Sequence, residues 1–375
     1  MSSRRNEMRV LVTGSSGFIG KNLVVRLREL SGFEVICFDR GDTLPMLADK
    51  VHQADAVVHL AGENRPKDVT DFVYGNVELT KALCIAIMAS ERKIPLILAS
   101  SMQATLPNPY GQSKLSAELA VEKFAAQTSN PAVIYRLTNV FGKWGKPNYN
   151  SVVVTFCHNI ANDLPIQIND PSTQLNLVYV DDVVSEFVCA LKAMPEGVRR
   201  GQVEPQYNIT LGELAAQIGA FKSSRNTLNS ERVGTGLVRA LYSTYVSYLP
   251  PSKFAYALQH YGDERGIFVE MLRTCDSGQF SYFTAHPGVT RGSHYHHTKT
   301  EKFLVIKGFA RFGFRHVVTN QSYEVFSSGE VPQVVQTVPG WAHSITNVGE
   351  EELVVMLWAS EIFDYARPDT VAYKV

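Results

Sequence analysis

The sequence predicts an α/β domain built on a doubly wound parallel sheet, followed by an all-β barrel. Up to about residue 200, short apolar runs rich in β-branched residues alternate with longer stretches of helical periodicity. After about residue 250, helical periodicity is absent, and short strand-like runs are bounded by Gly, Pro and Asn. The length of 375 residues suits two domains at about 100–200 residues each.

The strands expected in the first half are unbroken apolar runs, as in sheets that helices cover on both faces. They span residues 9–13, 34–38, 56–60, 95–99 and 132–136. The clearest helices, with apolar residues at i, i+3, i+4 and i+7, span 21–30 and 76–89. The double proline Pro250-Pro251 cannot continue a helix and predicts the joint between a first domain, 1–249, and a second, 250–375.

Composition excludes several classes of protein. Apolar residues make up 45% and charged residues 19%, which is typical of a soluble globular chain. Basic and acidic residues number 36 each, so no general field attracts nucleic acid or membrane, and neither is expected as a partner. The five cysteines form no C-x-x-C pair, unlike a disulfide framework or a thiolate metal site. We expect a cytoplasmic protein, because we find no targeting signal and no unbroken apolar run of about 18–20 residues.

A glycine-rich motif, Thr13-Gly-Ser-Ser-Gly-Phe-Ile-Gly20, joins the first strand to the first helix. In this context backbone N–H groups and the helix start can receive the pyrophosphate of a dinucleotide. The expected cofactor-binding residues of the motif are Gly14, Ser15, Ser16, Gly17, Phe18, Ile19 and Gly20. The second strand ends at Asp39-Arg40, where a carboxylate would bind the ribose hydroxyls of NAD and a guanidinium the 2′-phosphate of NADP. The sequence leaves this choice open.

Tyr110 and Lys114 have the Tyr-x-x-x-Lys spacing, which sets the two side chains one turn apart on a helix. There an ammonium group can lower the pKa of the phenol and make it a usable proton donor. A second match, Tyr295 to Lys299, lies in the β-rich half, so the spacing alone decides nothing. Only Tyr110 follows a strand end of the parallel sheet, where Ser101 would orient the substrate oxygen.

In order along the chain, these motifs resemble the Rossmann-type extended short-chain dehydrogenase/reductases that act on nucleotide-diphosphate sugars. The resemblance implies NAD(P)H along the glycine-rich turn with Leu60, Ala61 and Gly62 beside it. It also implies a catalytic triad of Ser101, Tyr110 and Lys114, and a sugar nucleotide near Arg136 and Asn139. The segment from Ser101 to Tyr110 is short, and Met102 replaces the acidic residue usual in dehydratases, so carbonyl reduction is favoured.

The β-rich half contains a second constellation, His294-x-His296-x4-Glu301, followed by Pro339-Gly-Trp-Ala-His343. In a strand His294 and His296 face the same side, and with Glu301 and His343 they offer a set of nitrogen and oxygen ligands that leaves positions open on a metal. The two motifs resemble the cupin barrel. Zinc is the expected ion, with iron, nickel or manganese as alternatives, and a metal-free barrel also stays open because some cupins work without metal.

Other titratable residues of the β-rich half could also serve the predicted metal site. His297 lies on the opposite face of the strand, and a structural role is favoured for it. As proton-transferring bases, His286, Tyr295, Lys299 and Lys302 are not distinguished by the sequence.

As a whole, the chain resembles the bifunctional C3-epimerase/C4-reductases of UDP-N-acetyl-L-fucosamine biosynthesis for capsule and O-antigen. This resemblance implies that the barrel epimerises C3 of a UDP-linked 4-keto-6-deoxy amino sugar. The first domain then reduces C4 with NADPH, or with NADH as the alternative. It also implies zinc and a homodimer. One alternative is a 4-ketoreductase whose cupin only binds substrate or dimerises. Another is a non-catalytic NADPH-binding sensor, which the retained Ser101, Tyr110 and Lys114 disfavour.

Overall fold

The computed structural model describes residues 7–66, 68–366 and 368–375. The chain forms two compact units. The first contains the residues up to Ile218 together with Ala240–Leu249, and the second contains Gly219–Arg239 and Pro250–Val375. Each unit has sheets and an apolar core of its own.

The first unit is built on a six-stranded sheet in which every pair of neighbours is parallel. In spatial order its strands are β2 (Phe33–Phe38), β1 (Met8–Thr13), β3 (Ala56–His59), β4 (Leu96–Ser101), β5 (Ala132–Leu137) and β8 (Val198–Gly201). All five strands expected in this half are present. They are apolar on both faces because helices cover both faces.

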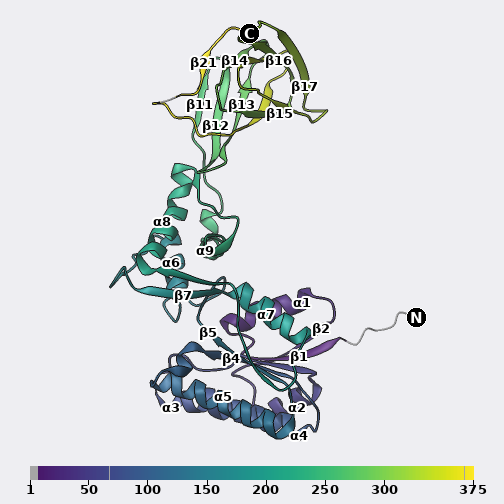
Figure 1. Ribbon diagram of the computed structural model, residues 1–375, viewed down its shortest axis with the longest axis vertical. Coiled ribbons are helices and arrows are strands. Elements are labelled where there is room, and N and C mark those ends of the chain that lie inside the picture. Colours follow the sequence, from purple (N-terminus) through teal and green to yellow (C-terminus); the bar gives the residue numbers. More distant parts are fainter. Residues whose placement is uncertain (1–6, 67, 367) are drawn as a thin grey trace, which may run out of the picture. The chain divides into compact units, whose positions relative to one another are not determined.

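Helices pack on either side of this sheet (Figure 1). On one face lie α1 (Phe18–Glu29) and α7 (Val180–Lys192), whose side chains share one core with alternate strand residues. On the other lie α2 (Leu44–Gln53), α4 (Leu79–Ala89) and α5 (Pro109–Thr128). The predicted doubly wound parallel fold is therefore confirmed.

The order of the strands creates the crevice in which such sheets bind ligands. β1 has β2 on one side and β3 on the other, so the connections from β1 and from β3 leave in opposite directions. Ligands of open α/β sheets bind at this point, beyond the carboxyl ends of the strands. The glycine-rich motif follows β1, and residues 60–62 follow β3.

The first unit also contains a small sheet of β6 (Asn139–Phe141), β7 (Gln174–Tyr179) and β9 (Gln206–Thr210). β6 runs parallel to β7, and β9 antiparallel to it. Three further helices are α6 (Val152–Ala161), in the first unit, and α8 (Leu211–Thr227) and α9 (Gly236–Val246), which contain residues of both units.

One helical stretch, from Thr70 to Ala89, is long and apolar enough to cross a membrane by length and composition. It consists of α3 (Thr70–Phe72), a π-helical turn η1 (Val73–Glu78) and α4. Asp71, Glu78 and Lys81 interrupt its apolar residues, so the stretch is not an unbroken apolar run in the sequence. Leu83, Cys84 and Ile87 of α4 are buried in the core under the sheet, as in a covering helix.

The second unit consists of two antiparallel sheets that enclose a core, as predicted for a barrel (Figure 1). The larger sheet has the order β10 (Asn229–Ser230), β12 (Gly266–Thr274), β13 (Gly278–Ala285), β20 (Leu353–Ala359), β15 (Glu301–Lys307) and β18 (Val334–Gln336), with β11 (His260–Asp263) paired to β12. The smaller has the order β17 (Ser322–Ser328), β16 (Phe309–His316), β19 (Trp341–Asn347), β14 (Thr290–Tyr295) and β21 (Val371–Ala372). Only the short β10 pairs in parallel.

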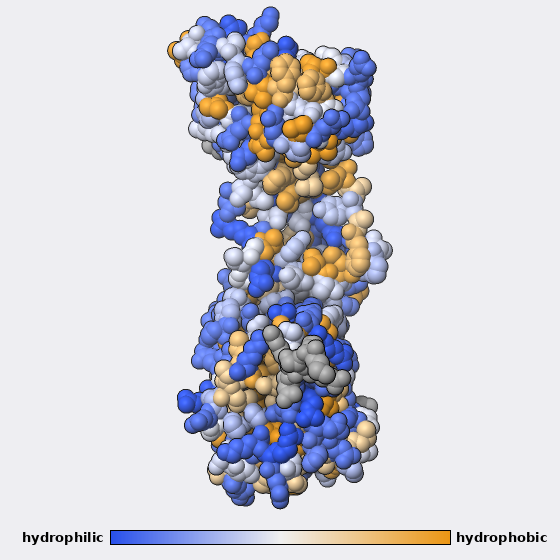
Figure 2. Space-filling model, turned by 90° about the vertical axis from the view of Figure 1, so that its right-hand side faces the viewer, coloured by the Kyte–Doolittle hydropathy of each residue, from blue (hydrophilic) through white to orange (hydrophobic). Residues whose placement is uncertain are grey.

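Aromatic and branched side chains from both sheets fill the barrel core, including Phe283, Phe303 and Phe312. Apolar side chains also gather on the surface of this unit (Figure 2). On the outer face of the larger sheet, Phe280 of β13 and Met356 of β20 are exposed.

Candidate active site and metal centre

The glycine-rich turn brings the ends of β1 and β3 together. Gly14 has φ +69°, and a Cβ there would lie 2.8 Å from the nitrogen of Ala61. A Cβ on Gly20 would lie 2.1 Å from the Gly14 carbonyl oxygen, so α1 packs tightly on the turn. No side chain caps the start of α1 at Gly17, and no acidic residue lies in its first turn. The free N–H groups and the helix dipole are arranged as a pyrophosphate requires.

Asp39 and Arg40, which the sequence left as competing indicators of cofactor, differ in their surroundings. The Asp39 carboxylate accepts hydrogen bonds from the Ser15 hydroxyl and from the N–H and hydroxyl of Ser16, at 2.9 and 2.7 Å. It therefore fastens the glycine-rich turn to the end of β2. The Arg40 side chain is 86% exposed and forms an ion pair with Glu63.

A buried polar network holds the segment after β3. The Thr13 hydroxyl oxygen accepts the N–H groups of Leu60 and Ala61, both at 3.2 Å, and lies 2.6 Å from Nδ1 of His59. Burial, reinforced by the charge of Lys114, lowers the pKa of His59 to about 3, so the imidazole is neutral. Its Nε2 lies 2.9 Å from the Thr80 hydroxyl. The backbone of residues 60–61 is thus tied through His59 to Thr80 of helix α4.

Ser101 and Tyr110 meet where β4 ends and α5 begins. The Asn108 side chain caps α5 by accepting the N–H of Gly111 at 2.7 Å. A Cβ on Gly111 would lie 2.2 Å from the Gln103 carbonyl oxygen, so the helix start packs directly on the turn after Ser101. Burial raises the pKa of Tyr110, although a hydrogen bond with Ser101 opposes this. The phenol is therefore protonated, as a proton donor requires.

Lys114 is buried one turn further along α5, beneath the crevice. Its Nζ donates a hydrogen bond of 2.9 Å to the carbonyl of Ala99 in β4. A Cβ on Gly62 would lie 3.7 Å from this Nζ, so the ammonium group also borders the segment after β3. Burial lowers the pKa of Lys114 to about 8, against the opposing effect of Glu118. The structure thus brings Ser101, Tyr110, Lys114 and Gly62 together.

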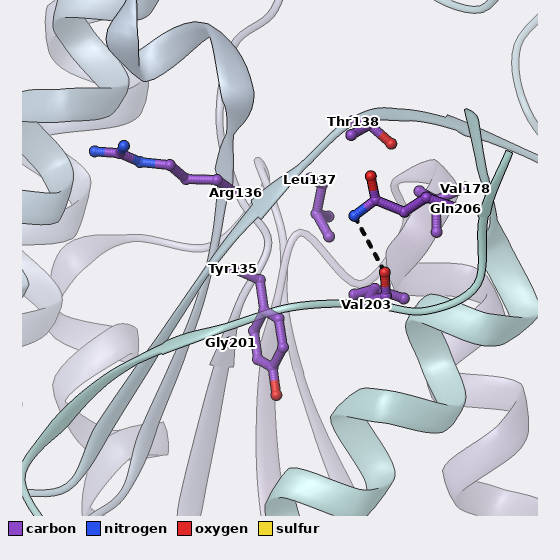
Figure 3. A pocket seen from close by; sticks show the side chains of 8 residues that line it. All are labelled: Tyr135, Arg136, Leu137, Thr138, Val178, Gly201, Val203 and Gln206. Atoms are coloured by element: carbon purple, nitrogen blue, oxygen red, sulfur yellow. Dashed lines mark hydrogen bonds between the residues drawn. The ribbon is translucent and has the colours of Figure 1, made fainter. Parts of the chain in front are cut away.

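Arg136, expected near the substrate, is engaged inside the protein. Its guanidinium donates to both carboxylate oxygens of the buried Glu118 at 2.7–3.2 Å. Arg200 also donates to Glu118, at 2.6 Å, as does the Ser100 hydroxyl. Figure 3 shows the Arg136 side chain directed away from a cavity of about 10 Å³ that Leu137 and Gln206 help to line.

Asn139, the other residue expected at the substrate, is exposed on β6. Its Nδ2 donates to the carbonyl of Asn176 in β7 at 3.0 Å. This contact orients the amide at the edge of the small sheet.

In the barrel, the four predicted metal ligands converge. His294 and His296 belong to or follow β14, Glu301 begins β15, and His343 lies on β19. One ligand atom from each residue lies within 4.8 Å of the others. The Glu301 carboxylate is 3.3 Å from Nε2 of His296 and 3.2 Å from Nε2 of His343. Thr337 fixes the Glu301 backbone, because its hydroxyl accepts the Glu301 N–H at 2.8 Å.

The electrostatics of this cluster fit a divalent cation. Burial and the neighbouring His343 lower the pKa of His294 to about 4, so its imidazole is neutral and can donate an electron pair. Burial alone would raise the pKa of Glu301, but its contacts with the imidazoles of His296 and His343 lower it below its usual range. Nδ1 of His343 is buried without a hydrogen-bond partner among the described residues. Three imidazoles and one carboxylate form a donor set suited to zinc.

Of the four candidate bases, Lys299 is the one beside the cluster. It is buried, its Nζ lies 3.7 Å from Glu301 Oε1, and it stacks 5.5 Å from the centre of the Phe363 ring. Lys302 extends over the Trp358 ring, Tyr295 contacts His297 and Tyr373, and His286 is exposed. His297 is also exposed, as expected for a side chain on the face opposite the metal ligands.

Sequence reasoning missed several residues that hold these sites. Glu118 follows Lys114 by four positions on the same helix face, a spacing that would have found it. Thr337 lies 36 positions from Glu301, whose backbone it fixes, and Asp369 accepts the N–H of His297 from 72 positions away. No local pattern marks either residue.

Comparison with known families supports this geometry. Residues 10–209, more than half of the chain, match the NAD dependent epimerase/dehydratase family. The chain belongs to this family. Membership in the NAD dependent epimerase/dehydratase family confirms the expected NAD(P)-binding domain. Residues 261–371 match the polysaccharide biosynthesis C-terminal domain, which covers most of the barrel.

Two of the similar proteins cover nearly all of this epimerase/dehydratase family member, and a third covers about two thirds of it. A UDP-2-acetamido-2,6-beta-L-arabino-hexul-4-ose reductase from Pseudomonas aeruginosa is 54% identical and covers 98% of this chain and 99% of its own. The crystal structure of the capsular polysaccharide assembling protein CapF from Staphylococcus aureus has a TM-score of 0.91 at 40% identity, covering 98% and 100%. A UDP-glucuronic acid 4-epimerase from Bacillus cereus, with a TM-score of 0.56 at 19% identity over 64% and 99%, shares the fold alone. The resemblance expected from the sequence therefore holds over both units.

Proposed function

We propose that the chain is a bifunctional enzyme that epimerises C3 and then reduces C4 of a UDP-linked 4-keto sugar. Its substrate is UDP-2-acetamido-2,6-dideoxy-β-L-arabino-hex-4-ulose, and its product is UDP-N-acetyl-L-6-deoxytalosamine. Residues 1–249 form the reductase domain and 250–375 the epimerase domain. The observation that carries the proposal is the 54% identity to a reductase named for this substrate, over both halves of the chain.

In the reductase domain, Tyr110 is the proton donor. Bound NADPH supplies a hydride to C4 of the sugar. Tyr110 holds the proton that the C4 oxygen gains as the ketone becomes a hydroxyl, and Ser101 orients that oxygen through its contact with the phenol. The ammonium of Lys114 stabilises the phenolate left behind. Asn139 lies on the strand where the family resemblance expects the sugar nucleotide, whereas Arg136 supports Glu118.

The surroundings of Asp39 and Arg40 favour NADPH over NADH. Three hydrogen bonds from Ser15 and Ser16 already occupy the Asp39 carboxylate. The exposed Arg40 forms an ion pair with Glu63 at the surface, where its guanidinium can also reach a 2′-phosphate. The ratio of kcat/KM for the two cofactors, compared between wild type and Arg40→Ala, tests this choice.

In the epimerase domain, His294, His296, Glu301 and His343 hold a zinc ion. A bound divalent cation supplies Lewis acidity toward the C4 ketone oxygen, which acidifies the C3 hydrogen. We assign removal of this proton to Lys299, whose buried Nζ lies 3.7 Å from Glu301 Oε1. Return of a proton to the opposite face inverts C3. Reduction of C4 then removes the ketone and makes the inversion permanent.

The exposed apolar side chains of Phe280 and Met356 support a homodimer, in which a partner would cover the outer face of the larger sheet. We also propose that the enzyme works in the cytoplasm.

Incubation of the full chain with the authentic UDP-4-keto sugar and NADPH tests the assignment, with the product identified by proton NMR. We expect one NADPH consumed per sugar and a product inverted at C3 with a hydroxyl at C4. Consumption of NADPH with retention at C3 would instead support a reductase whose cupin only binds substrate or dimerises. Binding of the sugar without NADPH consumption would indicate a sensor.

A further inference from the structure

The C-terminal segment holds the turn that separates two of the metal-binding residues. The carboxylate of Asp369 accepts the consecutive N–H groups of His297, Thr298 and Lys299, each at 2.8 Å. It also accepts the Thr298 hydroxyl at 3.0 Å. These three residues begin the four-residue turn, 297–300, that connects His296 to Glu301. Without the carboxylate, three adjacent N–H groups would lose their partner, and the turn would lose its anchor.

The backbone of the same residue determines which nitrogen of His296 carries the proton. The carbonyl of Asp369 contacts Nδ1 of His296. Because a carbonyl only accepts hydrogen bonds, Nδ1 must donate, and in the neutral ring Nε2 then keeps its free electron pair. That Nε2 faces a Glu301 oxygen at 3.3 Å. Two acceptors that face each other across this distance are arranged for a cation between them.

The residues after Asp369 fasten the neighbouring ligand as well. β21 pairs with β14, with Ala372 opposite His294. The N–H of Tyr373 donates to the carbonyl of Ser293 at 2.9 Å. Ser293 has φ +64° and lies at a bulge between Gly292 and His294, where pairing with β19 is interrupted. The C-terminal segment therefore supports β14 at its irregular point.

From these contacts we infer that Asp369 is a positioning residue of the metal centre, which fixes the Nδ1–H form of His296 and the turn before Glu301. The inference rests on the proposed function of the four ligands. Partners of this kind orient metal-binding imidazoles, and their loss costs about 10–100-fold in metal affinity. The inference assigns a specific function to a residue 68 positions after Glu301, through contacts that no local sequence pattern indicates.

The test uses the full chain with Asp369→Ala and Asp369→Asn. Alanine removes all side-chain contacts, whereas asparagine keeps one oxygen acceptor and replaces the other with a donor. Asp364→Asn is the matched control, because it removes the same charge from the same segment and its carboxylate accepts the N–H of Ala366 within its own turn. Circular dichroism melts verify that each variant is folded. The dissociation constant for Zn²⁺ is measured by competition with a chromophoric chelator.

Two measurements on metal-free protein accompany the metal titration. One is the tautomer of His296 by ¹⁵N NMR of the ring, and the other is amide hydrogen exchange at His297, Thr298 and Lys299. A role in general stability alone would not change the ring tautomer. We expect wild type to show the Nδ1–H form and protected amides. Asp369→Ala keeps the backbone carbonyl but loses the carboxylate contacts that hold it against His296, so we expect mixed tautomers and fast exchange.

For the metal, we expect a dissociation constant raised about 10–100-fold in Asp369→Ala, a smaller rise in Asp369→Asn and no change in Asp364→Asn. Unchanged affinity, tautomer and exchange in a folded Asp369→Ala protein would overturn the inference and leave the metal site standing. If wild type bound no Zn²⁺, the proposed metal site would fail, and the metal-positioning role with it. The tautomer and exchange data would then show whether Asp369 orders an empty site.

Discussion

The ammonium group of Lys114 donates a 2.9 Å hydrogen bond to the carbonyl of Ala99, two residues before Ser101 on the same strand. This bond joins helix α5, which carries Tyr110, to the strand that carries Ser101. The two hydroxyls are therefore held together by a buried charge on a group whose pKa burial lowers to about 8.

The rate of reduction should depend on the protonation of Lys114. Its charged form prevails below pH 8 and is lost as the pH rises through about 8, while the raised pKa of Tyr110 keeps the phenol protonated there. We therefore expect kcat for NADPH oxidation, at saturating substrate, to fall above pH 8. In Lys114→Arg the guanidinium keeps its charge at high pH, so the fall in kcat of this variant should begin at a higher pH than in wild type. A flat profile up to pH 10 in wild type would contradict this role.

Replacement of Tyr110 by Phe should separate the two activities. Without the phenolic proton, NADPH oxidation should fall by about 10²–10⁴-fold, the usual contribution of a general acid. Exchange of the C3 hydrogen with deuterated water should continue at the wild-type rate, because it depends on barrel residues. Loss of both activities in a folded protein would argue against separate sites.

Glu118 should contribute to the stability of the folded protein. Its side chain is fully buried and pairs with two guanidinium groups, so Glu118→Ala leaves those charges without a partner. We expect the free energy of unfolding to fall by about 3 kcal/mol, the low end for a broken buried pair because Arg136 and Arg200 still reach water. Glu122, 34% exposed, binds Arg200 at the surface, and Glu122→Ala is the control, with an expected loss below about 1 kcal/mol. Equal losses in urea unfolding would refute the distinction.

Removal of a metal ligand should abolish both metal binding and exchange. His294→Ala and Glu301→Gln each delete one donor of the cluster, so metal content after dialysis and C3 deuterium exchange should both be lost. His297→Ala is the control, since this histidine is exposed beside the ligands and its backbone contacts remain. Undiminished exchange in protein stripped of metal would exclude the Lewis-acid role.

The fold was largely predictable because its strands are marked by local patterns. Apolar runs and helical periodicity located the parallel strands, and the change of pattern after residue 250 located the barrel. The ligands His294 and His296 were identifiable because alternate residues of a strand face one side. Glu301 and His343 then completed a familiar donor set.

Other features depend on contacts that sequence spacing does not encode. The spacing of Tyr110 and Lys114 predicts a lowered phenol pKa, whereas burial of the phenol raises it. Arg136 belongs to a motif associated with the substrate, yet its partner Glu118 is known only once β5 and α5 are packed together. Asp369 reaches His296 only because β21 pairs with β14 across a large separation in sequence.

Proton NMR of the UDP-4-keto sugar with the full chain in deuterated water, with and without NADPH, tests the bifunctional assignment most directly. Without NADPH, we predict loss of the C3 proton signal while the ketone remains. With NADPH, we predict a product that carries deuterium at C3 and a hydroxyl at C4. A product that retains the C3 proton and the original C3 configuration would contradict the account.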